Sequence, residues 1–365
     1  MIKIKDIVQH LEALAPLAYQ EDYDNAGLLT GNGDIAVSGV LIALDCTEQV
    51  VEEAVNKGCN MIISHHPVVF RPLKKLTGGN YVERTVIAAI QNNIALYSSH
   101  TNLDSVSHGV NKRIADKLGL VKTRILRPKS NLLGKLTTFV PVENTDSVLS
   151  ALHAAGAGMI GEYKNCSFLL EGTGTFLPTG TANPSIGQTG VLEKVRENRI
   201  EVIFPMHIKS RVLSALFEAH PYEEVAYYIH SLENSDKLTG SGMIGELPQP
   251  MKTERFIAVV KSQFKCGCIR HTAIIKNHVK TIALCGGSGS FLLPDAIKYQ
   301  ADMFVSADLK YHDFFNADGK IIIADIGHFE SEQYTKELLY EHLSEIFPNI
   351  ALHFTEVNTN PIHYA

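Results

Sequence analysis

Asn60-Met61-Ile62-Ile63-Ser64-His65-His66-Pro67 is a short apolar run that ends in two adjacent histidines and a proline. An apolar run of this length, preceded by Gly58, predicts a buried strand. Pro67 fixes its own φ and favours extended backbone at His66, so the strand ends here and both imidazoles can face one site. Ligands of open α/β sheets bind at the carboxyl ends of the strands. We therefore expect a functional site at His65 and His66.

Three other apolar runs end in polar side chains of the same kind. The run 94–99 leads to His100 and Asp104, the run 320–325 leads to His328, and the run 40–44 leads to Asp45. Glu332 follows His328 by four residues, which places both on one face of a helix that begins near Gly327. Neutral imidazoles and carboxylates are ligands for zinc, iron or manganese. A lone histidine at a strand end is more often an ordinary hydrogen-bonded side chain, but four such clusters together predict a metal site.

Four stretches carry a resemblance to a known family: IISHHP at 62–67, YSSHTNLD at 97–104, DNAGLLTG at 24–31 and ADIGHFESE at 324–332. They resemble the GTP cyclohydrolase 1 type 2 homologues, also called the Nif-three-like family, and the resemblance covers nearly the whole chain. It implies that two metal ions per chain are held by His65, His66, Asp104, His328 and Glu332. Many relatives have a tryptophan before the early Asp-Asn, where this chain has Tyr23 and contains no tryptophan at all.

Length and composition indicate a soluble globular protein of two domains. The chain has 365 residues, of which 45% are hydrophobic and 20% are charged. Its formal charge of −6, from 33 basic and 39 acidic residues, does not indicate nucleic-acid binding. The start lacks the apolar core of a signal peptide, and no apolar run approaches the length of a membrane span. We therefore expect a cytoplasmic protein without a membrane partner.

The strand-end motifs lie in two segments, 1–128 and 240–365, in which predicted strands and helices alternate. This rhythm favours an α/β fold with a mostly parallel sheet. The run 281–285 resembles 41–46, and 302–306 resembles 60–64, which puts Ala307 and Asp308 where His65 and His66 stand in the first segment. We expect two similar α/β halves that together form one metal-binding domain.

The middle segment, 131–235, has a different rhythm and is predicted to be an inserted α+β domain. Its elements read β-α-β and then β-α-β, with a long Gly/Thr/Pro loop from Gly172 to Gly190. The stretches GAGMIG at 156–161, GTGTF at 172–176 and HPYEE at 220–224 resemble the ferredoxin-like insert, related to the PII and CutA trimers, of longer family members. His207 and His220 in this segment are expected to have structural roles.

The resemblance and the ligand count point to an enzyme. Five protein ligands for two divalent ions, zinc first with iron or manganese as alternatives, leave open positions of the kind that catalytic sites keep. Our first hypothesis is a metal-dependent hydrolase of a nucleotide-type small molecule, GTP cyclohydrolase-like by resemblance, with Glu332 as the bridging ligand. His100 would orient a ligand or move a proton, and His312 is a further acid–base candidate. The alternative is a non-catalytic metal-handling protein, or a regulatory or scaffold ring in which the insert acts as a sensor or an oligomerisation module.

Two loops and the oligomeric state remain open at this stage. The glycine-rich loop 286–290 could bind an anion through its N–H groups or simply make a tight strand-to-helix turn. The acidic loop 21–27 could be a connector or could contact the metal site. The small sheet of the insert needs its edges covered, and the resemblance adds threefold contacts to a family dimer, so we expect a closed homohexamer.

Overall fold

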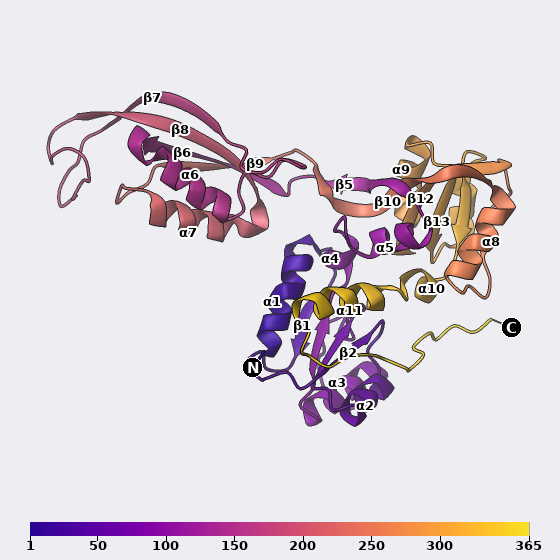
Figure 1. Ribbon diagram of the computed structural model, residues 1–365. Helices are drawn as coiled ribbons and strands as arrows, with labels where there is room; N and C mark the ends of the chain where they lie inside the picture. The colour runs from indigo at the N-terminus through magenta and orange to yellow at the C-terminus, as the bar shows by residue number, and fades with distance from the viewer. Residues whose placement is uncertain (365) are drawn as a thin grey trace. The chain divides into compact units, whose positions relative to one another are not determined.

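The computed structural model describes residues 1–364, and this part of the chain forms two compact units. Unit 1 comprises Met1–Arg127 together with the residues from Leu238 onward, and unit 2 comprises Pro128–Lys237. Both are mixtures of helices and β-sheets (Figure 1), so the expected mixed α/β class is confirmed. Within the described residues, no helix is both long and apolar enough to cross a membrane.

The first sheet of unit 1 has the strand order β1-β4-β3-β2-β15. Its strands are β1 (Gly27–Thr30), β2 (Val40–Ala43), β3 (Met61–Ser64), β4 (Ala95–Ser98) and β15 (Leu352–Phe354). β15, β2, β3 and β4 run parallel, and β1 pairs antiparallel with β4. Every residue of β2, β3 and β4 is buried, which explains why these strands read as continuous apolar runs.

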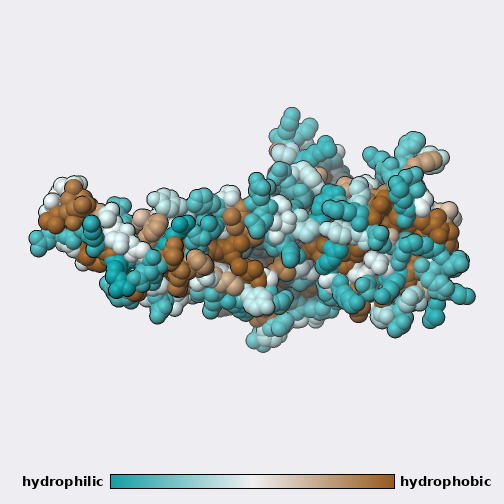
Figure 2. Space-filling view, turned by 90° about the horizontal axis from the view of Figure 1, so that it is seen from above, coloured by the Kyte–Doolittle hydropathy of each residue, from teal (hydrophilic) through white to brown (hydrophobic). Residues whose placement is uncertain are grey.

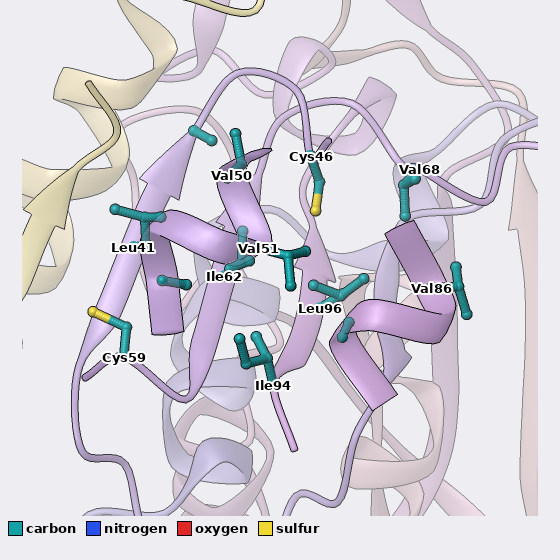
Figure 3. Packing of buried hydrophobic residues seen from close by; sticks show 13 residues of the cluster. Leu41, Cys46, Val50, Val51, Cys59, Ile62, Val68, Val86, Ile94 and Leu96 are labelled. Atoms are coloured by element: carbon teal, nitrogen blue, oxygen red, sulfur yellow. The ribbon is translucent and has the colours of Figure 1, made fainter. Parts of the chain in front are cut away.

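Helices α1 (Ile4–Leu14), α2 (Glu48–Asn56) and α3 (Tyr81–Gln91) accompany this sheet. Thr47 caps α2 and Asn80 caps α3, each accepting a hydrogen bond from an N–H in the first turn. The apolar faces of α2 and α3 pack against β2, β3 and β4, as Figure 3 shows for Leu41, Ile62 and Leu96 beside labelled valines of both helices. This core fixes the carboxyl ends of three parallel strands side by side.

The second sheet of unit 1 has the order β11-β14-β13-β12-β10-β5. Its strands are β5 (Val121–Lys129), β10 (Asp236–Lys252), β11 (Arg270–His271), β12 (His278–Ser288), β13 (Met303–Ala307) and β14 (Ile322–Asp325). β12, β13 and β14 run parallel, and β11 pairs antiparallel with β14. The remaining helices of unit 1 are α4 (Thr101–Asp104), α5 (Val110–Lys117), α8 (Thr253–Gln263), α9 (Leu293–Lys298), α10 (His328–Glu332) and α11 (Thr335–Ile346), of which α11 packs against β2 and β15 of the first sheet.

Unit 2 is a four-stranded antiparallel sheet of order β7-β8-β6-β9 with two helices on one face (Figure 1). In chain order its elements are β6 (Leu133–Pro141), α6 (Thr145–Ala154), β7 (Phe168–Phe176), β8 (Glu193–Pro205), α7 (Lys209–Ala219) and β9 (Tyr227–Leu232). Its core is built from residues of β6, β8, α6 and α7. Apolar side chains also gather at the end formed by the loop between β7 and β8, at the left of Figure 2.

Two predicted elements are wrong in detail. The loop predicted from Gly172 begins only after Phe176, because Gly172–Phe176 continue β7 in register with β8. The alternation of glycine and threonine there gave no apolar pattern to indicate a strand. The strand expected in the run 94–99 ends at Ser98, and Asp104, expected just beyond its end, lies on α4. The chain turns there because the Asn102 side chain accepts from His100 N–H at 2.8 Å and donates to the Ala15 carbonyl at 2.7 Å.

Candidate metal centre

The candidate centre of unit 1 begins where β3 ends. The backbone N–H groups of His65 and His66 both donate to the Leu44 carbonyl, at 3.1 and 3.0 Å, so the chain turns sharply. The Ser64 hydroxyl donates to the His66 carbonyl at 2.8 Å and tightens this turn. As a result the two adjacent imidazoles lie on one side, with ring centroids 4.9 Å apart. The turn expected at Pro67 therefore brings both histidines into one site.

Each of four imidazoles at the centre is held through its Nδ1 atom by an oxygen of the protein. The four pairs, each 2.7 Å apart, are His65 with the Ser99 carbonyl, His66 with Asp45, His100 with Asp24 and His328 with Asp308. An Nδ1–H that donates to an oxygen leaves the Nε2 lone pair free to act as a ligand, which is the arrangement typical of histidines at metal sites.

On one side of the centre, two of these Nε2 atoms meet the same carboxylate oxygen. Glu332 Oε2 lies 2.9 Å from His66 Nε2 and 3.0 Å from His328 Nε2. The two Nε2 atoms themselves are 3.2 Å apart. Two lone pairs at this separation repel each other unless a proton or a cation lies between them. The three donors thus form a pocket for positive charge.

On the other side, two buried ligand atoms have no hydrogen-bond partner among the described residues. They are His65 Nε2 and Asp104 Oδ1, which lie 3.7 Å apart. His65 Nε2 is also 3.8 Å from Glu332 Oε2. Leaving a buried polar atom unsatisfied costs roughly 1–3 kcal/mol, so a cation that both atoms can contact would remove a real cost.

The ligand atoms fall into three groups in which all distances are within 4.8 Å. The first group is His65, Asp104 and Glu332, the second is His66, His328 and Glu332, and the third is His65, His66 and His100. Glu332 belongs to the first two groups, and its side chain is almost fully buried. The donor set therefore fits metal ions, with Glu332 placed between two groups of donors.

The charges at the centre follow from burial and from Glu332. Burial opposes a charge on His66 and on His328, but hydrogen bonds and attraction from neighbouring carboxylates outweigh it and raise the pKa of His66 to about 9 and of His328 to about 11. Burial lowers the pKa of His65 to about 3. Burial and repulsion from Glu332 raise the pKa of Asp104, while the adjacent imidazoles hold the pKa of Glu332 well below its usual range despite its burial. Protons on His66 and His328 thus occupy the place that a cation can take.

A cavity of about 340 Å³ opens beside the centre. Aspartate, asparagine, histidine and apolar residues line it: Leu44, Asp45, His66, Pro67, Phe70, His100, His328, Phe329, Asn360, Pro361 and Ile362. The last three come from the C-terminal segment, which is tied to the centre where the Thr359 hydroxyl donates to Asp45 at 2.6 Å. Because the other oxygen of Asp45 holds His66, this segment both closes the cavity and supports a candidate ligand.

Comparison with known proteins places the chain in a family. A profile of the Duf34/NIF3 (NGG1p interacting factor 3) family matches residues 2–361. The chain belongs to this family. Two relatives named "GTP cyclohydrolase 1 type 2 homolog" agree: that of Halalkalibacterium halodurans is 37% identical over 360 residues (98% of this chain and 96% of the relative), and that of Bacillus subtilis is 35% identical over 366 residues (99% and 98%). The resemblance found in the sequence is thereby confirmed.

Solved structures support the same assignment. A Bacillus cereus protein described as related to NIF3 matches with a TM-score of 0.87 and 36% identity over 100% of both chains. A Staphylococcus aureus protein matches with a TM-score of 0.78 and 32% identity, over 100% of this chain and 99% of the other. The NIF3 fold therefore extends over both units of the present chain.

In this member of the NIF3 family, the structure brings all five expected ligands and His100 together. The ring of His100 lies 5.3 Å from that of His65 and 5.4 Å from that of His66. The other acid–base candidate, His312, is not brought to the centre. It is exposed on the 3-10 helix Tyr311–Ala317, where its ring contacts those of Tyr311 and Phe315, and it belongs to none of the three donor groups.

Both open loops acquire a role at the centre. Asp24 of the acidic loop holds His100 and also accepts hydrogen bonds from the Thr101 N–H and hydroxyl. Burial alone would raise the pKa of Asp24, but these hydrogen bonds lower it to about 2. In the glycine-rich loop, the N–H groups of Gly286 and Gly287 donate within the protein, to Asn111 and Ser331, and these two are therefore not free for an anion. Gly287 has φ +59°, and a Cβ there would overlap Glu332 Oε1.

Sequence reasoning missed three supports of the centre. Asp308, which holds His328, had two signals: it follows the apolar run 302–306, and the weak internal repeat aligned it with the His65-His66 pair. The Ser99 carbonyl that holds His65 is a backbone group, so its residue type carries no signal. The C-terminal residues Asn360–Ile362 have no regular structure and no apolar period, and nothing in the sequence connected them with the cavity.

Proposed function

We propose that the protein is a dinuclear metal-dependent hydrolase that acts on a small, nucleotide-type molecule. The observation that carries this proposal is the position of Glu332 Oε2, which is shared by two groups of donors. His65 and Asp104 complete one group, and His66 and His328 complete the other. Histidine and carboxylate donors without a cysteine suit zinc first, with iron and manganese as alternatives.

Two divalent ions, when bound, supply Lewis acidity and a nucleophile at neutral pH. The chain's own residues do the rest. Asp45, Ser99 and Asp308 orient the imidazoles, so that little reorganisation is needed at the centre. His100 lines the cavity. Because its Nδ1 is hydrogen-bonded to Asp24, its Nε2 is the atom that can accept or donate a proton.

The cavity favours a small substrate. Its volume of about 340 Å³ is at the lower end of the range of small-molecule sites, roughly 300–1,000 Å³. Phe70, Phe329 and Ile362 offer apolar surface on which a planar ring can pack, while His66, His100 and His328 lie on the polar side. The names of the relatives, "GTP cyclohydrolase 1 type 2 homolog", add support for a purine nucleotide as the first substrate to test.

The test is turnover by protein of known metal content. Metal-free protein is reloaded with zinc, manganese or ferrous iron and incubated with nucleotides, phosphoesters and cyclic amides, and products are followed by mass spectrometry. We expect metal-dependent turnover that is lost in Glu332→Gln and strongly reduced in His100→Asn. The exposed His278 provides a matched control, so His278→Asn should keep full activity. Absence of turnover from fully loaded protein would favour the alternative, a non-catalytic metal-handling or regulatory protein.

We also propose that unit 1 consists of two similar α/β halves and that unit 2 is a ferredoxin-like, PII/CutA-like insert. The support for the first is that each sheet of unit 1 contains a run of three neighbouring parallel strands with a short antiparallel strand beside the last: β2-β3-β4-β1 and β12-β13-β14-β11. In the first sheet β15 adds a fourth parallel strand. The support for the second is the element order β-α-β-β-α-β with a sheet order of β7-β8-β6-β9.

We propose further that the chain assembles with itself, as a closed hexamer. β7 is an edge strand of unit 2 and carries three consecutive exposed apolar residues, Phe168, Leu169 and Leu170. An exposed apolar edge of this kind is a site for pairing with another chain. Light scattering should give about six chains per particle, and Phe168→Glu should lower this number. A wild-type monomer would refute the proposal.

A further inference from the structure

Unit 2 contains a cavity of about 690 Å³ that the proposed function does not use. It is lined by residues of β6, β7, β8, the loop 177–186 and the segment 222–228. Four aromatic side chains and one carboxylate stand out among them: Phe139, Phe176, Tyr222, Tyr228 and Glu197. The volume lies within the range of small-molecule sites in proteins, roughly 300–1,000 Å³.

Glu197 is a buried carboxylate without a positive partner among the described residues. Its exposed fraction is 7%, and its Oε1 accepts a hydrogen bond from the Tyr222 hydroxyl at 2.8 Å. No hydrogen bond to its Oε2 occurs in the described part of the chain. The arginines nearest along β8 are already engaged. Arg196 pairs with Glu171, and Arg199, which also lines the cavity, pairs with Glu201.

The neighbouring histidine does not supply the missing charge. His220 Nε2 donates to the Phe139 carbonyl at 2.9 Å, while Nδ1 accepts the Tyr222 N–H at 3.1 Å. These two bonds fix a neutral imidazole, and burial lowers the pKa of His220 further from the charged state. Burial and the adjacent Glu197 raise the pKa of Tyr222, so its hydroxyl stays protonated and donates. Neither His220 nor Tyr222 therefore offers a positive charge to the Glu197 carboxylate.

The backbone around Glu197 makes room for this charge. A Cβ on Gly174 would overlap Glu197 Oε2, so the glycine of the GTGTF stretch leaves space for the carboxylate. Glu223 and Glu224 of the HPYEE stretch also line the cavity and add negative charge. A buried charge is costly unless an opposite charge accompanies it, so a cation that enters the cavity would offset this cost.

We propose that this cavity of unit 2 binds a small organic cation, a primary amine or a guanidine, through Glu197 Oε2. The aromatic faces of Phe139, Phe176 and Tyr228 pack against its apolar body and attract its charge. The Tyr222 hydroxyl occupies Oε1 and leaves Oε2 as the single acceptor for the ligand. The proposal is independent of the metal centre, which lies in unit 1.

The test uses the full-length protein and isothermal titration calorimetry with putrescine, agmatine and spermidine. 1,4-Butanediol, which has the length of putrescine but no charge, is the neutral comparison. We expect at least one of the three cations to bind with one site per chain and butanediol not to bind. Glu197→Gln, which keeps the shape and the Tyr222 bond, should weaken binding at least about tenfold, because it removes a charge-assisted hydrogen bond. Glu218→Gln on the exposed face of α7 is the matched control for net charge and should bind as the wild type does.

Gly174→Ala gives a second, independent variant, because it crowds Oε2 without removing the charge, and it should also weaken binding. Circular dichroism and light scattering of each variant confirm that fold and assembly are intact. Three outcomes overturn the proposal. They are no binding of any of the three cations at millimolar concentration, equal binding by Glu197→Gln, and a changed number of chains per particle in Glu197→Gln. The last outcome would show that a second copy of the chain covers the carboxylate.

Discussion

Replacing Glu332 by glutamine should remove both metal ions of the proposed centre, whereas replacing His65 or His328 by alanine should remove only one. Glu332 Oε2 lies 2.9 and 3.0 Å from the Nε2 atoms of His66 and His328, and 3.8 Å from that of His65. The same oxygen is therefore within reach of both groups of donors. Each histidine belongs to one of the two groups that contain Glu332.

The size of the effect can be worked from the number of ligands. A four-ligand zinc site is worth roughly 10–16 kcal/mol, so one ligand contributes on the order of 3 kcal/mol. Since about 1.4 kcal/mol corresponds to a factor of ten in affinity, losing one ligand weakens the binding of an ion by roughly 100-fold. Glu332→Gln should impose this loss on both ions, because an amide oxygen carries no charge to share between them. His65→Ala should impose it on one ion and leave the other nearly unchanged.

Equilibrium dialysis against zinc, followed by elemental analysis, measures both ions. With free zinc held between the affinities of wild type and variant, we expect two ions per chain in the wild type, about one in His65→Ala and in His328→Ala, and none in Glu332→Gln. Glu330 is the matched control, since it is as buried as Glu332 but belongs to none of the donor groups. Full metal content in Glu332→Gln would refute the shared carboxylate, and so would the loss of both ions in each histidine variant.

Three further predictions follow from the same contacts. Asp308→Asn should weaken the binding of the ion at His328 about tenfold in a chelator competition. This is the lower end of the 10–100-fold range for residues that orient ligands, because the side chain of Asp308 is 46% exposed. An equal loss of affinity for the other ion would contradict this. Because the hydroxyls of Ser130 and Ser235 are 3.0 Å apart, residues 132–234 should be replaceable by a short linker with the metal content unchanged, whereas a soluble deletion variant without metal would count against it. Asp24 ionises with a pKa of about 2 in the fold instead of 3.8, so its charge stabilises the protein above about pH 4 by about 2 kcal/mol, and this is lost as the pH falls to 2. In urea unfolding, Asp24→Asn should have a lower free energy of unfolding at pH 7, and this free energy should fall less between pH 4 and pH 2 than it does in the wild type. The same pH dependence in both proteins would contradict the prediction.

The strand-end positions of the candidate ligands could be read from the sequence for a physical reason. Strands that are buried on both faces need continuous apolar residues, so the runs before His65 and after Asn93 stand out from their surroundings. Polar residues at the ends of such runs are equally visible. The spacing of His328 and Glu332 also gave the correct face of α10, because both side chains reach the same centre.

The parts that could not be read are those that depend on distant or backbone contacts. The hydroxyl of Thr359 donates a hydrogen bond to Asp45, which lies 314 positions earlier in the chain, and no local sequence pattern predicts such a pair. The second half of β7 could not be predicted, because Gly172 and Gly174 interrupt the alternation of apolar and polar side chains that indicates a strand. The reason for Gly174 becomes visible only when Glu197 is placed beside it.

The position of unit 2 in the chain explains why the donor motifs could be recognised without knowledge of that unit. The chain leaves and re-enters unit 1 through β5 and β10, which are neighbours in the second sheet, and the side chains of Ser130 and Ser235 meet at this point. Ends that are already adjacent make the insertion of a folded segment cheap in closure entropy. Sequence changes in unit 2 therefore need not displace His65, Asp104 or Glu332. By the same reasoning the metal motifs carry no information about the cavity around Glu197, which must be interpreted from its own residues.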